Sequence, residues 1–159
     1  MIDLASVHVD IASLDDAAAV EVLARVVRGR GLSTELGVSA PVLRRAVAAC
    51  VAEEGLTPPA SASEGEVARA ALRALAAAAP ERAEDIGALA RADHRAHTFS
   101  GLETIAVLGL VIAVLQTEVT IEVEDGRITA FSLRKRASGA KEVTAFLETV
   151  AGFFGRPSR

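Results

Sequence analysis

Hydrophobic and polar residues alternate strictly near the start of the chain, over Ser6–Ala12. Every second residue in this stretch is apolar, namely Val7, Val9 and Ile11. His8 and Asp10 stand between them. A repeat of two residues is typical of a half-buried β-strand. The pattern therefore predicts an N-terminal strand.

Helical periodicity replaces the alternation directly afterwards. Ser13 stands in an N-cap position with Asp16 three residues later, the spacing of a capping box. An apolar stripe at helical spacing then follows, formed by Val20, Leu23, Val26 and Val27. Gly29 is a typical residue for the end of a helix. We therefore expect the first helix between Ser13 and Gly29.

The segment 32–95 is predicted to be helical throughout, apart from a Pro/Ser-rich connector at Leu56–Ser63. Ser63 and Glu66 form a second capping box, which opens an Ala-rich helix that runs to Pro80. A shorter helix is expected to start near Glu81. Helices with such small side chains are marginal alone, so these must pack against other elements.

A helix that is apolar on all sides is predicted at Thr104–Leu115. A bilayer requires about 20 apolar residues, and this run ends at Gln116 after fewer. We therefore expect a helix buried in the fold or against a partner, with membrane association through Thr104–Leu115 as an alternative. Gly109 lies in its middle and costs helix stability, which is easiest to understand where another backbone comes close.

Two alternating runs flank Asp125-Gly126, the strongest short signal for a β-hairpin. A regular two-residue turn would place Ile121 opposite Ala130 on an apolar face. Phe131 and Leu133 would then fall on the polar face. Either a β-bulge shifts the register or a protein partner covers these two residues. A partner surface is accordingly predicted at Gly109, Phe131 and Leu133.

The last segment predicts an amphipathic helix. Its apolar stripe comprises Val143, Phe146, Leu147, Val150 and Phe153 or Phe154. Together the elements predict an α+β fold, in which a small three-stranded sheet joins the N-terminal strand to the C-terminal hairpin and helices cover it. We expect a single domain over 1–159, with the apolar helix, hairpin and closing helix in 99–155.

The stretch Leu32–Leu56 is similar to the last two helices of a helix-turn-helix, and its "EEGL" resembles the recognition-helix end of winged regulators such as the GntR family. Ser39 would cap the recognition helix, and Arg44 and Arg45 could reach phosphate. Base-reading positions, however, would be held by Ala40–Val42, which bring no side-chain donor. DNA binding through Ser39, Arg44 and Arg45 is therefore the alternative.

Charge and composition exclude several classes of function. The chain of 159 residues has a net charge of -4, which opposes binding to nucleic acid. Its single cysteine, Cys50, excludes an intrachain disulfide and a multi-cysteine metal site. The start of the chain has no signal-peptide pattern, so we expect a cytoplasmic protein.

Catalytic and metal-binding motifs are not evident. The chain has no Gly-rich phosphate loop, nucleophile elbow or HExxH motif. Asp93, His94 and His97 have helical spacing, but a metal site would need a further ligand such as His8. We therefore expect no cofactor, no metal and no enzymatic activity.

The C-terminal run "TIAVLGLVIAVLQTEVTIEVEDGRITAFSLRKRASGAKEVTAFLETVAGFF" resembles the effector-associated constant component families of bacterial conflict systems. Ser6–Arg28 also fits their pattern, so the resemblance covers about half of the chain. The segment 32–95 departs from it, because the family is shorter there. The resemblance implies a small non-enzymatic component that accompanies an NTP-dependent effector.

We therefore predict a non-enzymatic protein–protein interaction or adaptor component that associates with a protein partner or with itself. The alternatives are a helix-turn-helix regulator and a membrane-associated component.

Overall fold

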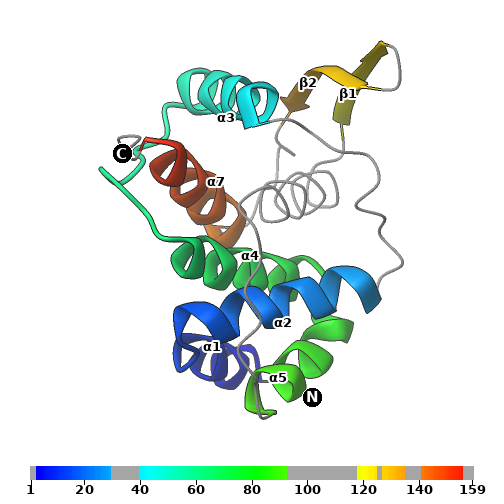
Figure 1. Cartoon of the computed structure of the whole chain (residues 1–159). Helices are drawn as coiled ribbons and strands as arrows, with labels where there is room; N and C mark the ends of the chain where they lie inside the picture. Colours follow the sequence, from blue (N-terminus) through cyan, green and yellow to red (C-terminus); the bar gives the residue numbers. More distant parts are fainter. Residues whose placement is uncertain (1–2, 30–39, 93–117, 125–126, 135–140, 156–159) are drawn as a thin grey trace.

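The computed structural model describes residues 3–29, 40–92, 118–124, 127–134 and 141–155 (Figure 1). In these residues it contains six α-helices, one short 3-10 helix and one two-stranded sheet. The elements are α1 (Leu4–Ala12), α2 (Asp16–Gly29), α3 (Ala40–Glu54), α4 (Glu64–Ala78), η1 (Pro80–Arg82), α5 (Ala83–Arg91), β1 (Glu118–Glu124), β2 (Arg127–Arg134) and α7 (Lys141–Phe154).

Helix α4 lies at the centre of the molecule (Figure 1). It packs against α1, α2 and α5 on one side and against α7 on the other. Five of its buried residues are alanines: Ala68, Ala70, Ala71, Ala74 and Ala76. Because these side chains are small, neighbouring helices can approach from both sides. The prediction that the Ala-rich helix must pack on other elements is therefore confirmed.

The start of α4 is fixed by the predicted capping box. Ser63 Oγ accepts a hydrogen bond from the backbone N–H of Glu66 at 3.1 Å. In return, the Glu66 carboxylate accepts one from the backbone N–H of Ser63 at 2.8 Å. Both bonds satisfy amides that have no partner within the helix.

The first segment of the chain is a helix, so the predicted N-terminal strand is wrong. The carboxylate of Asp3 accepts a hydrogen bond from the N–H of Ala5 at 3.1 Å and caps α1. Val7 and Ile11 are buried, whereas Val9 is 67% exposed. A strand would place all three on one face, but a helix separates Val9 from a pair that is one turn apart.

The predicted capping box at Ser13 and Asp16 is also wrong. Ser13 follows the end of α1, and its hydroxyl donates to the carbonyl of Asp10 at 2.7 Å. The start of α2 is capped by Asp15 instead, whose carboxylate accepts from the N–H of Ala18 at 2.8 Å. Gly29 is the last residue of α2 that the structure describes, so the end of the helix at this position stays a prediction.

The predicted α+β class, with a three-stranded sheet beneath the helices, is contradicted. Helices dominate the described residues, and the buried core described there is formed by helices and the turns that join them. The physical reason is that α1 cannot supply the third strand. The sheet is limited to the hairpin, which lies beside α3 at the periphery (Figure 1).

Helix α7 joins the central helix to α3. Its predicted stripe is buried at Val143, Phe146, Leu147 and Val150, and Phe153 and Phe154 pack partly against the core. On its other side α7 contacts α3, which in turn contacts β2. The order of layers is therefore α1, α2 and α5, then α4, α7 and α3, with the hairpin outermost (Figure 1).

Candidate functional site

The hairpin contains the register shift that the sequence left open. Val123 pairs with Ile128, but Glu122 pairs with Ala130, so one residue of β2 is extra at this point. Beyond the shift, Ile121 pairs with Phe131. Directly paired residues lie on the same face of a ladder. The bulge therefore resolves the phase conflict by itself, and no partner is needed to explain it.

Leu133 follows the same rule, because it pairs with Val119. Gly109, the third residue of the predicted partner surface, lies outside the described residues, as does the whole of Thr104–Leu115. The partner surface at these three positions stays a prediction, but the argument from the polar face no longer supports it.

Helix α3 is the predicted recognition helix, and it faces the protein interior along much of its length. Its predicted core residues Leu43, Val47 and Cys50 are buried. Val42 is also buried, at 8% exposure, although a DNA-reading helix would present this position to base edges. Ser39 lies outside the described residues.

The two arginines of the DNA-binding alternative are both exposed. The guanidinium of Arg44 lies over the ring of Phe154 in α7, 5.7 Å from its centroid, a cation–π contact. Arg45 bonds weakly within its own helix, to the carbonyl of Pro41 at 3.4 Å. Arg44 thus contributes to the contact between α3 and α7, whereas Arg45 bonds only within α3.

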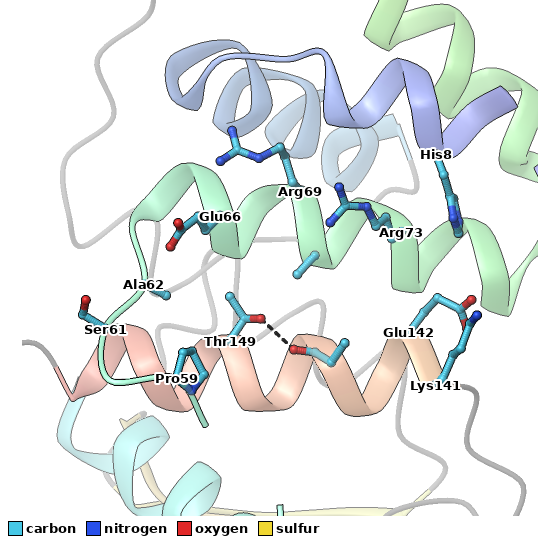
Figure 2. Close-up of a pocket in the computed structure, with 12 residues that line it drawn as sticks. His8, Pro59, Ser61, Ala62, Glu66, Arg69, Arg73, Lys141, Glu142 and Thr149 are labelled. Atoms are coloured by element: carbon cyan, nitrogen blue, oxygen red, sulfur yellow. Dashed lines mark hydrogen bonds between the residues drawn. The ribbon is translucent and has the colours of Figure 1, made fainter. Parts of the chain in front are cut away.

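A groove runs between α4 and α7, with a volume of about 640 Å³ (Figure 2). The connector before α4 closes one end, and α1 lies at the other (Figure 2). Its lining residues come from four segments: His8, Pro59, Ser61, Ala62, Glu66, Arg69, Ala70, Arg73, Lys141, Glu142, Ala145 and Thr149. It is a candidate binding site because it combines small apolar walls with several charged side chains.

Some polar groups of the groove serve the fold. Glu66 belongs to the capping box of α4. Arg69 pairs with the carboxylate of Asp16 at 2.9 Å and donates to the carbonyl of Leu14 at 3.1 Å. The hydroxyl of Thr149 donates to the carbonyl of Ala145 at 2.7 Å, within α7 (Figure 2). These groups have little capacity left for a ligand.

Four other polar residues lie at the α1 end of the groove, and they differ from these groups in their hydrogen bonding. Arg73, Lys141 and Glu142 make no hydrogen bond or ion pair with any described residue. The Nε2 atom of His8 is buried and has no hydrogen-bond partner. In Figure 2, His8 reaches from α1 toward the start of α7, on the same side as Arg73.

Sequence reasoning missed this cluster, because its members lie far apart in the chain and His8 was assigned to a strand. One local signal was available. Arg69 and Arg73 are four residues apart, and Glu66 precedes Arg69 by three, so a helix places all three on one face. That spacing marks one charged wall, but it does not reveal the opposite wall in α7.

The acid and histidine cluster Asp93, His94 and His97 lies outside the described residues. Where the structure is described, no group of three potential metal ligands occurs. In those same segments, no helix combines the length and apolar character required to cross a bilayer. The chain matches no family model, no curated protein and no solved structure.

Proposed function

We propose that the protein is a non-enzymatic interaction module, an adaptor that binds a partner protein through the edge of β1 that no described strand pairs with. The supporting observation is the position of the hairpin. Within the described residues β1 pairs with β2 alone, and β2 is the strand that contacts α3. The backbone groups on the other edge of β1 therefore have no strand partner there.

An isolated two-stranded hairpin is only marginally stable in water. Among the described elements, β2 contacts α3 directly, whereas the main contact of β1 is its pairing with β2. A strand added at the outer edge would bond to the backbone groups of β1 that no described strand pairs with, which is a common mode of peptide recognition. A partner strand would thus extend the two-stranded sheet and stabilise the hairpin.

Charge indicates the kind of strand that fits. Glu118, Glu122 and Glu124 hold alternate positions of β1, so they share one face. The register places arginines opposite two of them, Arg134 and Arg127, but it places Ala130 opposite Glu122. A partner strand with a basic residue beside Glu122 would supply the missing charge.

A second copy of the same strand fits less well. An antiparallel pair of β1 strands centred on Ile121 would place Glu118 of each copy opposite Glu124 of the other. Like charges directly opposite one another destabilise a ladder. We therefore favour a different protein over self-association. The resemblance to conflict-system components leads us to propose an effector as that protein.

A synthetic peptide of alternating lysine and valine, as long as β1, tests this proposal. We expect it to bind the intact protein and to slow hydrogen exchange at the outward-facing amides of β1. A glutamate–valine peptide of equal length should not. Glu122→Lys should weaken binding of the lysine peptide by about 1 kcal/mol, roughly fivefold, because an attraction becomes a repulsion.

The matched control is Glu53→Lys, which makes the same change at an exposed position of α3 outside the hairpin and should leave binding unchanged. The proposal is wrong if the lysine peptide leaves exchange in β1 unaltered, or if the glutamate peptide binds equally well. A stable homodimer held through β1, seen by sedimentation, would also contradict the preference for a different protein.

A further inference from the structure

We propose that the groove between α4 and α7 binds an organic anion, a small molecule with a carboxylate or phosphate head and a short apolar body. The head would lie at the end formed by His8, Arg73 and Lys141 (Figure 2). The site uses no residue of the hairpin, so it is independent of the proposed partner strand.

Charge selects an anion. After the internal bonds of Glu66 and Arg69 are set aside, the free charges of the groove are those of Arg73, Lys141 and Glu142. Two cations and one carboxylate leave a local excess of one positive charge, on a chain whose net charge is -4. A cluster of opposite sign to the whole molecule concentrates anions at that place.

Arg73 is a central group of the site. The residue is half-buried, and yet no described residue accepts a hydrogen bond from its guanidinium. Charged groups removed from water normally have partners. A carboxylate or phosphate offers two oxygens in the planar arrangement that a guanidinium binds best.

His8 supports the same conclusion from a different element. Its Nε2 atom is covered by the protein but has no hydrogen-bond partner. Buried polar atoms are nearly always bonded, and the exceptions call for an explanation. A rotation of the side chain would bring this nitrogen to the groove, where the ring, protonated on Nε2, would donate to an oxygen of the head group.

The remaining walls determine the body of the ligand. Pro59, Ala62, Ala70 and Ala145 are small apolar residues, and they leave room for an aliphatic chain. The volume of about 640 Å³ lies within the usual range for small-molecule sites, about 300–1,000 Å³. An inorganic anion would leave this part of the groove unused.

Titration of the full-length protein with hexanoate, hexyl phosphate and hexanol tests the site, with amide chemical shifts as the readout. We expect saturable shifts at His8, Arg73 and Lys141 with at least one of the two anions and none with hexanol. Binding by one anion alone identifies the head group. Arg73→Gln should weaken binding of that anion at least tenfold, whereas Arg45→Gln, a change at an exposed arginine of α3, should not.

Lys141→Gln is a second variant, at an exposed side chain without bonds to described residues, and it should weaken binding severalfold without affecting the fold. The proposal fails if neither anion gives saturable shifts or if hexanol binds as tightly as the anions. It also fails if both Arg73→Gln and Lys141→Gln bind like the wild type.

Discussion

Single residues fix the connector between α3 and α4 against α7. The backbone N–H of Thr57 donates to the carboxylate of Glu148 at 2.7 Å. Nearby, Gly152 of α7 is buried directly beneath Pro59. A Cβ atom at Gly152 would lie 2.7 Å from Cγ and 3.0 Å from the carbonyl oxygen of Pro59. Only glycine lets the helix and connector approach this closely, and Pro59 in turn forms a wall of the groove.

Gly152→Ala should therefore destabilise the protein by about 1–3 kcal/mol, since the connector must move to admit the methyl group. The free energy of unfolding from chemical denaturation measures this change.

Gly87→Ala in α5 is the matched control. Its new Cβ would meet the flexible end of Arg91 at 3.3 Å and Val7 Cγ2 at 3.4 Å. Alanine also has the higher helix propensity, by up to about 1 kcal/mol. We expect this variant to be as stable as the wild type or more stable. Equal stability of the Gly152→Ala variant and the wild type would show that the close contact is relieved without cost.

At the scale of elements, α1 is the segment whose local pattern admits two structures. Val7 and Ile11 are four residues apart, a spacing that shares one face in a strand and also in a helix. Leu14 continues the helical face and is buried as well. Packing against α4 and α5 selects the helix, and Asp10 of α1 forms an ion pair with Arg91 of α5 at 2.6 Å.

Val9 distinguishes the two structures. Val9→Lys should change the free energy of unfolding by less than about 0.5 kcal/mol, because Val9 is 67% exposed on the helix. Val7→Lys should cost several kcal/mol or unfold the chain, because it places a charge in the core. In a strand the two variants would be equally harmful, so similar losses in thermal or chemical denaturation would contradict α1.

The hairpin shows a different limit of local pattern. Its two strands lie where the alternation places them, but the register is set by one extra residue in β2. The residue types in the two strands do not reveal where a bulge of this kind lies. The sequence therefore showed that Phe131 and Leu133 would fall on the polar face of a regular hairpin. Only the strand pairing showed that a bulge shifts them to the other face.

At the scale of the whole molecule, charge and burial both oppose DNA binding. The chain carries a net charge of -4. Val42 is buried in α3, and Arg44 lies against Phe154. A protein that binds DNA through phosphate contacts needs several free cations on one surface.

We therefore expect no tight, salt-dependent binding to random duplex DNA at moderate salt, measured by fluorescence anisotropy of the labelled duplex. The double change of Arg44 and Arg45 to alanine should leave this result the same. Nanomolar affinity that falls steeply with salt and disappears in the double variant would restore the helix-turn-helix interpretation.

The sequence by itself determined the features that depend on neighbours within a few residues. The capping box at Ser63 and the buried stripe of α7 follow from local hydrogen bonds and from a period of 3.6 residues. Tertiary structure decided what local pattern left open. It selected a helix for α1, and so removed the third strand of the predicted sheet. It also brought His8, Arg73 and Lys141 to one end of a groove, because packing joins α1, α4 and α7 although they are distant in the chain.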